Sequence, residues 1–215
     1  MKKQHPIKNL IKGGESMHLD FKFEISDAPK IARSLVAFAN TKGGKLLIGV
    51  KDNGSIAGIR SEEEFFMVDS AAKLYCKPEV MFTSKEWNLD GKKILEIEIA
   101  PSDKGPHKAP DSKGNYRAFI RNNDQNLLAN GTMMKIWKKQ KSMENIEITY
   151  GEAEHLLMQH LDKNEISDFG QIKSVCNLSK FETEDLLADF ILMELVDMQI
   201  TEDNSFFKLK NHKEI

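Results

Sequence analysis

A strict alternation of apolar and charged residues near the N-terminus constrains the fold of this chain most. Leu19, Phe21 and Phe23 alternate with Asp20 and Lys22. A period of two is that of a β-strand with one buried face, so we expect Asp20 and Lys22 to emerge together on the opposite face. A carboxylate beside an ammonium group can hold a divalent ion with one side chain and steady a phosphate or water with the other.

The composition narrows the class of protein. With 215 residues and 40% apolar content, the chain can bury one large core or two small ones. It has neither the roughly 18 uncharged apolar residues of a membrane span nor the apolar run of a signal peptide. Cys76 and Cys176 lie far apart, which fits a reducing cytosol better than a disulfide scaffold. We therefore expect a cytoplasmic protein with no membrane partner.

Charge is distributed unevenly along the chain. From Ile146 to the end there are 6 basic and 15 acidic residues, whereas residues 1–145 hold 25 basic and 18 acidic ones. A basic part joined to an acidic part indicates a different partner for each. Binding of a polyanion is predicted only for the first part.

Periodicity and turn signals predict a mixed α+β domain over residues 10–140. Ser26 or Asp27 can cap a helix that ends near Asn40, and Asn53-Gly54 is a strong hairpin signal. The other elements expected in this domain are strands at 45–50 and 55–59, a helix at 61–76, a hairpin at 79–100, a strand at 116–121 and a closing helix that contains 133–137.

Residues 146–210 have a different rhythm. Three helices, at about 151–161, 168–175 and 181–195, are followed by a hairpin at 198–209, which is the winged-helix arrangement. The third helix, the usual reader of the major groove, has four acids and one lysine over residues 180–189. These charges would repel phosphates, so dimerisation or protein contact is favoured for this domain.

Three sequence blocks together resemble the Schlafen core domain, which is also described as an AlbA-like DNA-binding domain or a divergent ATPase-associated domain. The blocks are residues 15–22, 37–45 and 47–54, and later pieces at 106–107 and 116–121 also fit. The resemblance covers about residues 10–130, and winged-helix C-termini accompany this domain in many bacterial proteins. It implies a mixed-sheet α+β fold followed by a small winged-helix domain.

The resemblance also implies candidate catalytic residues. Animal Schlafens cleave structured RNA with a metal ion, and their three acids fall by position on Glu15, Asp20 and Asp52. These three would bind Mg²⁺ or Mn²⁺, while Lys22 would contact the scissile phosphate or merely neutralise Asp20. The second acid is a glutamate in the family pattern. Animal Schlafens also pair two lobes in one chain, so a homodimer would be needed to rebuild their groove.

The string Gly43-Gly44-Lys45 invites an ATP-binding interpretation. A phosphate-binding P-loop needs Gly-x4-Gly-Lys-Ser/Thr between a strand and a following helix. Here a predicted helix precedes the glycines, a strand follows them, and Leu46 occupies the Ser/Thr position. We therefore expect a tight helix-to-strand turn, and neither ATP binding nor ATPase activity.

The leading hypothesis is a bacterial-type regulator, for example of transcription, that binds DNA or structured RNA through its basic domain. Its candidate phosphate contacts, with Arg121 the strongest, are Lys22, Lys42, Lys45, Lys108, Arg117 and Arg121. The alternative is a metal-dependent endoribonuclease acting on structured RNA such as tRNA. A third possibility is a protein-interaction regulator that binds no nucleic acid. A homodimer is expected, with the acidic C-terminal domain as one route to it.

Overall fold

The computed structural model of the chain describes residues 5–142 and 150–210. The chain divides into two compact units, Met1–Leu128 and Ala129–Ile215. The predicted start of the second domain at Ile146 lies outside the described residues. In the described ranges, no helix is long and apolar enough to cross a membrane.

The first unit is built on a four-stranded mixed sheet. Its strands are β1 (Leu19–Lys22), β2 (Gly44–Ile48), β3 (Thr83–Leu89) and β4 (Lys92–Ile99), in the order β1-β2-β4-β3. β1 and β2 are parallel, and the other pairs are antiparallel. Helix α2 (Ala28–Ala39) connects the parallel pair, as a crossover of this kind requires. This is the α+β mixed sheet predicted from the sequence.

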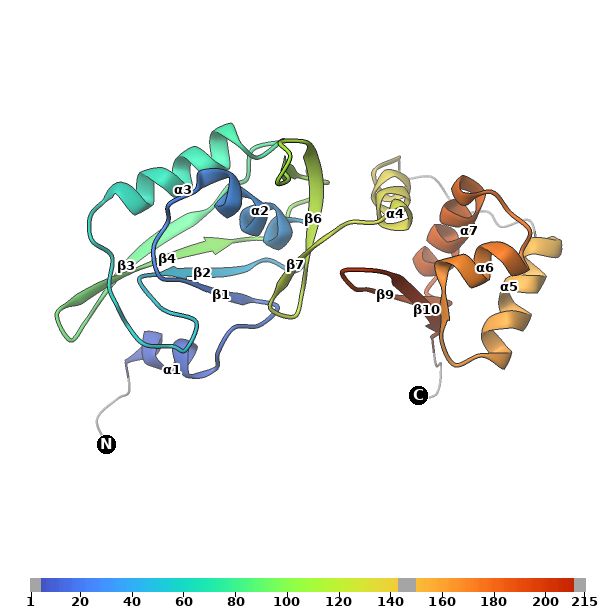
Figure 1. Cartoon of the computed structure of the whole chain (residues 1–215), viewed down its shortest axis with the longest axis horizontal. Coiled ribbons are helices and arrows are strands. Elements are labelled where there is room, and N and C mark those ends of the chain that lie inside the picture. The colour runs from blue at the N-terminus through green and yellow to red at the C-terminus, as the bar shows by residue number, and fades with distance from the viewer. Residues whose placement is uncertain (1–4, 143–149, 211–215) are drawn as a thin grey trace. The chain divides into compact units, whose positions relative to one another are not determined.

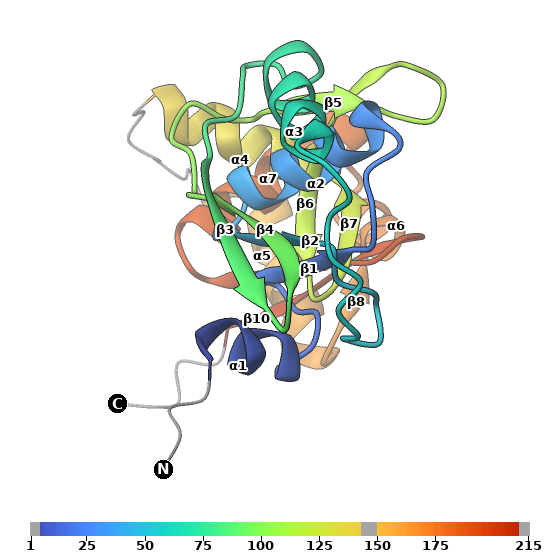
Figure 2. The ribbon, with the colours of Figure 1, turned by 90° about the vertical axis from the view of Figure 1, so that its left-hand side faces the viewer.

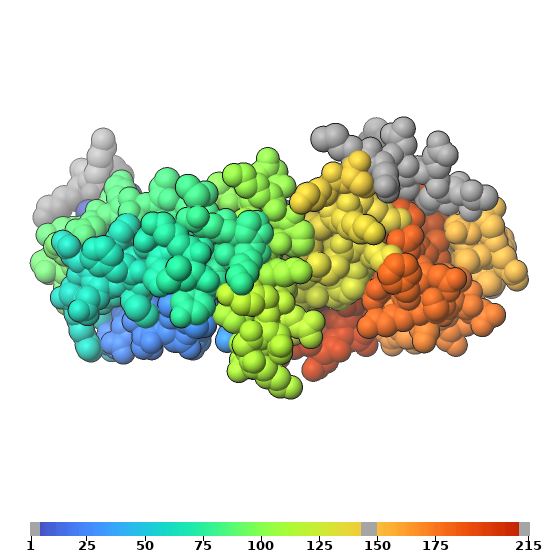
Figure 3. Space-filling model, turned by 90° about the horizontal axis from the view of Figure 1, so that it is seen from above, coloured from blue at the N-terminus to red at the C-terminus, as the bar shows by residue number. Residues whose placement is uncertain are grey.

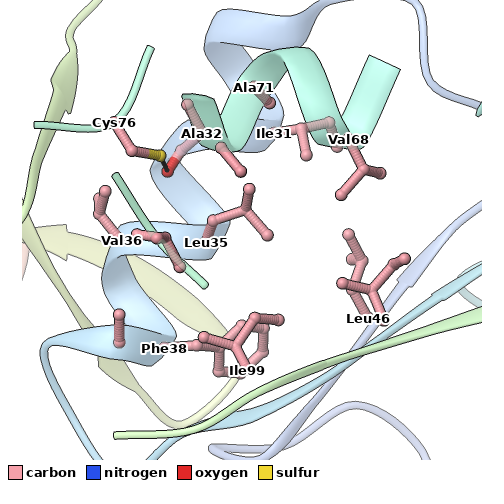
Figure 4. Close-up of a cluster of buried hydrophobic side chains, with 14 of the residues drawn as sticks. Ile31, Ala32, Leu35, Val36, Phe38, Leu46, Val68, Ala71, Cys76 and Ile99 are labelled. Atoms are coloured by element: carbon pink, nitrogen blue, oxygen red, sulfur yellow. Dashed lines mark hydrogen bonds between the residues drawn. The ribbon is translucent and has the colours of Figure 1, made fainter. Parts of the chain in front are cut away.

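Helices cover both faces of this sheet. α2 and α3 (Glu63–Leu74) lie on one face, and α1 (Pro6–Lys12) lies on the other (Figures 1 and 2). Ile31, Leu35 and Phe38 of α2 pack on the first face (Figure 4). Phe21 is buried on the second face, in a cluster with Ile7 of α1.

Asp27 begins α2 as the sequence predicts. Its Oδ1 accepts a hydrogen bond from the Lys30 backbone N–H at 3.1 Å, and Pro29 occupies the first turn. The helix ends at Asn40, whose side-chain amide donates to the carbonyl groups of His107 and Phe119 at 2.8 and 2.9 Å. Asn40 therefore ties the end of α2 to the later strands of the unit.

A second, three-stranded sheet completes the first unit. It consists of β5 (Lys108–Pro110), β6 (Tyr116–Asn122) and β7 (Gln125–Leu128), all antiparallel and in chain order. β5 and β6 pack against α2. α3 lies at the surface of the unit (Figure 3), and its Phe66 side chain is exposed.

The predicted strand at 55–59 does not form. The turn at Asn53-Gly54 is present, but only an isolated bridge joins Val50 to Ile56. The physical reason is that both edges of β2 are already taken, one by β1 and the other by β4. The chain instead leaves the sheet at Gly49, whose φ is 91°.

The second unit contains four helices and a three-stranded sheet among its described residues. Its core includes Leu157, Ile172, Leu187 and Phe207. The sheet order is β8-β10-β9, with both pairs antiparallel. In chain order the elements are α4 (Gly131–Ser142), α5 (Glu152–Lys163), β8 (Ser167–Asp168), α6 (Phe169–Val175), α7 (Lys180–Leu192), β9 (Val196–Ile200) and β10 (Ser205–Leu209).

Helix α4 belongs to the second unit, and not to the first domain as predicted. The prediction placed it at the end of the first domain, but the first unit ends at Leu128 and α4 packs against α7 in the second. Asn130 caps α4 by accepting from the Met133 N–H at 2.8 Å, and the Asn130 amide also donates to Ser205 Oγ at 2.7 Å. The border therefore falls about a dozen residues before the predicted one.

Candidate functional site

Asp20 lies in a buried ion-pair cluster and does not emerge into solvent. It is 3% exposed, because the α2 side of the sheet is covered as well. Its Oδ1 lies 3.3 Å from an Nη atom of Arg121, and its Oδ2 lies 2.9 Å from Lys22 Nζ. Lys22 is the more accessible partner, with 27% of its side chain exposed. Of the two predicted roles for Lys22, this geometry favours neutralisation of Asp20.

Arg121 holds this part of the first unit together. Its guanidinium donates to the carbonyl groups of Ser16 and Leu19 at 3.2–3.3 Å and to Asn126 Oδ1 at 3.0 Å, in addition to Asp20. Its side chain is only 1% exposed. A side chain buried in this way is not accessible to a phosphate, so the prediction that Arg121 is the main phosphate contact conflicts with the structure.

Glu15 lies beside Asp20, as the predicted site requires. Glu15 Oε1 accepts a hydrogen bond from the Phe21 backbone N–H at 2.8 Å, which folds residues 15–21 back on themselves. Partial burial raises the pKa of the Glu15 carboxyl, and the neighbouring Asp20 carboxylate raises it further. The Phe21 N–H and the Lys22 ammonium act in the opposite direction.

Asp52 does not join these two carboxylates in a metal site. It is exposed in the turn that follows β2. Within the described ranges, no three acidic, histidine or cysteine side chains are grouped so that they could hold a metal ion. Both oxygens of Asp20 also face cations of the protein, which would repel an incoming Mg²⁺ or Mn²⁺. The residues as arranged therefore do not fit a metal ion.

The turn from α2 into β2 presents two of the predicted basic residues. Lys42 is exposed, whereas Lys45 Nζ lies 2.6 Å from Glu96 Oε1 and 3.4 Å from Glu98 Oε2. The hydrogen bond to Glu96 raises the pKa of Lys45. Gly43 has a φ of 71°, so a tight turn does precede the strand.

Lys77, which was not among the predicted site residues, lies opposite Lys108. The backbones of Lys77 and Lys108 exchange two hydrogen bonds, of 2.8 and 2.7 Å, so their side chains leave the same face. The Lys77 ammonium lies 4.2 Å from the centroid of the Tyr116 ring. Arg117 alternates to the other face of β6, where it lies 3.9 Å from Asp111. Only the pairing across 31 residues reveals Lys77, so no local sequence pattern could have found it.

Two acids of helix α7, Asp185 and Asp189, form ion pairs with lysines of α4 in the same unit. Lys139 Nζ of α4 lies 2.6 Å from Asp189 Oδ1 and 3.2 Å from Asp185 Oδ2, and Lys135 lies 3.0 Å from Asp185. Partial burial opposes the change, but the two ammonium groups lower the pKa of the Asp185 carboxyl. Part of the predicted phosphate-repelling face of α7 is therefore occupied by α4.

A family model and two solved structures each match part of the chain. The family model described as Schlafen, AlbA_2 matches residues 15–130. No curated protein matches the chain. The DIP2311 protein from Corynebacterium diphtheriae is 17% identical over 57% of this chain with a TM-score of 0.42, and the chain covers only 27% of that protein. The N-terminal domain of an ATP-dependent DNA helicase RecG-related protein from Nitrosomonas europaea is 19% identical over 54% of this chain and 82% of its own, with a TM-score of 0.36.

Proposed function

Because the chain belongs to the Schlafen, AlbA_2 family, we propose that its first unit binds nucleic acid through the phosphate backbone. The observation that carries this proposal is the Lys77–Lys108 pair. Two like charges held directly opposite each other across a β-bridge repel each other, and a counter-charge between them would relieve that repulsion. A phosphate group supplies that counter-charge, and the Tyr116 ring beside Lys77 offers a surface for a sugar or base.

The salt dependence of binding tests this proposal. Each phosphate contact contributes roughly 0.9 to the slope of log K against log salt on duplex DNA and about 0.7 on a single strand. The Lys77→Gln/Lys108→Gln double variant should therefore lower the slope by about 1–2 and weaken binding at low salt. The measurement is fluorescence anisotropy with labelled duplex DNA and hairpin RNA.

A matched control removes two lysines that are already neutralised. Lys73 lies 2.8 Å from Asp69, and Lys93 lies 3.4 Å from Glu86. Lys73→Gln/Lys93→Gln changes the net charge by the same amount, but both of the lysines that it removes are in ion pairs with acidic residues. An equal loss of slope in both double variants would show a general charge effect. Absence of binding to either nucleic acid at low salt would refute the proposal itself.

The endoribonuclease alternative receives support from one observation, the proximity of Glu15 and Asp20. It would require Asp52 to join them and both cations to leave Asp20. Incubation of total tRNA with Mn²⁺ or Mg²⁺ tests it, because a pure binding protein leaves the RNA intact. Cleavage that persists in Asp52→Ala would show that the three acids are not the site.

For the second unit we propose a winged helix that contacts protein, with a second copy of the chain as the partner. The order α5-β8-α6-α7-β9-β10 and the sheet order β8-β10-β9 support this proposal. α4 lies on α7, the helix that would otherwise enter a major groove. Sedimentation of the full chain across a concentration series tests dimerisation, and a monomer throughout would contradict it.

A further inference from the structure

A pocket of about 550 Å³ opens at the N-terminal end of the parallel strands β1 and β2. Its volume is within the roughly 300–1,000 Å³ of sites for small ligands. The end of α1, the approach to β1, the turn at 42–45 and the end of β4 form its walls. Leu10, Ala100 and Pro101 provide an apolar surface in it, which suits a flat ring system.

The glycine turn places polar groups at one side of this pocket. A Cβ on Gly43 would lie 2.6 Å from the Ile99 carbonyl oxygen, so only glycine lets the turn lie this close to β4. His18 Nδ1 lies 3.2 Å from the Gly43 carbonyl oxygen and must donate to it, since a carbonyl only accepts. The His18 ring is therefore held beside the turn that carries Lys42.

The charges that line the pocket differ in their availability. Lys45 lies between two carboxylates, Glu96 at 2.6 Å and Glu98 at 3.4 Å, so these three groups together carry one excess negative charge. In the described part of the chain, no acidic group lies within 4.0 Å of the Lys42 ammonium. The pocket thus contains one unpaired cation, Lys42, and one half-exposed carboxylate, Glu98.

This arrangement selects a ligand with an anion at one end and hydrogen-bond donors at the other. Lys42 suits a phosphate, and the Glu98 carboxylate accepts from hydroxyl or amino groups while it repels a second phosphate. A nucleotide inside a strand has a phosphate on each side of its sugar, so Glu98 disfavours it. A terminal nucleotide or a free one avoids that repulsion.

We propose that this pocket binds one nucleotide through its phosphate monoester, with Lys42 on the phosphate, the base against Leu10 and Pro101, and Glu98 on the sugar or base donors. The nucleotide is a free nucleoside monophosphate or the phosphorylated end of a strand. The strand-end form rests on the nucleic-acid binding proposed above, whereas the free form does not.

Calorimetry with the full chain tests the pocket directly. Adenosine 5′-monophosphate should bind and adenosine should not, and Lys42→Gln should weaken the monophosphate at least tenfold. Lys113→Gln removes an exposed lysine in the turn before β6 and serves as the matched control. Three outcomes would overturn the inference. Adenosine and its monophosphate could bind equally, or the two lysine variants could lose affinity equally. The third outcome is that neither compound binds and that strands with phosphorylated ends are not preferred either.

Short RNA strands with a 5′-phosphate, a 3′-phosphate or hydroxyl ends identify the source of the nucleotide. Tighter binding of a phosphorylated strand than of the free monophosphate indicates a strand end, and equal binding indicates the free nucleotide. Binding of hydroxyl-ended strands without any preference for phosphorylated ends or for the free monophosphate would refute the pocket and keep the proposed function. Binding of the monophosphate alone would do the reverse.

Discussion

Replacement of Arg121 by methionine should unfold the first unit at much lower urea concentrations. The guanidinium makes its hydrogen bonds to Ser16, Leu19, Asp20 and Asn126 while almost fully buried. Removal of one partner of a buried pair costs roughly 3–5 kcal/mol, because the other charge stays buried without compensation. Lys22 still faces Asp20, so we expect about 3 kcal/mol, the lower end of that range.

A double-mutant cycle with Asp20→Asn separates the pair from its surroundings. The amide of this variant would keep an oxygen as acceptor but lose the charge, at a cost of about 1.5–3 kcal/mol. The Asp20→Asn/Arg121→Met variant contains neither the buried carboxylate nor the buried guanidinium, so no charge of this pair is left without its partner. It should therefore cost less than the sum of the single changes by about 1–3 kcal/mol.

Trp87 in the first unit and Trp137 in the second are the two tryptophans of the chain. In a Trp137→Phe background, the fluorescence of Trp87 therefore reports unfolding of the first unit. A loss below about 1 kcal/mol for Arg121→Met, or additive single changes, would refute the stabilising role of the buried Asp20–Arg121 pair. A reduced salt slope of nucleic-acid binding with unchanged stability would instead restore Arg121 as a phosphate contact.

Three further changes test other parts of the structure. The raised pKa of Glu15 means that its contribution to stability is complete below its ordinary value of 4.5 and is lost as pH rises through the folded pKa. Glu15→Gln keeps the acceptor for the Phe21 N–H and does not titrate. The urea midpoint of this variant, relative to that of the native chain, should therefore rise from pH 4.5 towards 7. A difference that stays constant with pH would contradict this. Gly44→Ala should lower the free energy of unfolding of the first unit by about 1–3 kcal/mol, since the new Cβ meets the Phe38 ring. An unchanged urea midpoint would show that the ring or the backbone at residue 44 can move to make room. Lys139→Ala should cost the second unit roughly 1 kcal/mol by Trp137 fluorescence in a Trp87→Phe background, and the effect should vanish in Asp185→Asn/Asp189→Asn.

Local signals in the sequence predicted most elements of both units, but not α1, β5, β7 or β8. The Asp27 cap, Pro29 and the apolar face of α2 act within a few residues of one another, so they could be read directly. The same holds for the hairpin between β3 and β4, where Asp90 and Gly91 have positive φ values of 52° and 79°. The family resemblance was also correct, because it depended on the order of several blocks.

The misjudged positions depend on partners far away in the chain. Asp20 and Arg121 are 101 residues apart, and the contact forms because the Arg121 side chain reaches from β6 to the backbone and carboxylate of β1, which no local pattern records. The strand expected after Asn53-Gly54 fails for a similar reason, since β4 takes the place it would need. A basic residue at a strand end can be a phosphate contact or a buried clamp, and sequence alone does not separate the two.

The partnership of α4 with α7 decides how the chain can be divided for study. A fragment that ends at residue 140 would carry α4 without the aspartates that Lys135 and Lys139 contact. Without α7, helix α4 would have unpaired lysines and an exposed Ile136, which is buried in the full chain. Its unpaired positive charges would bind nucleic acid nonspecifically. A fragment that ends at Leu128 avoids this false positive, so only the shorter fragment can attribute binding to the first unit itself.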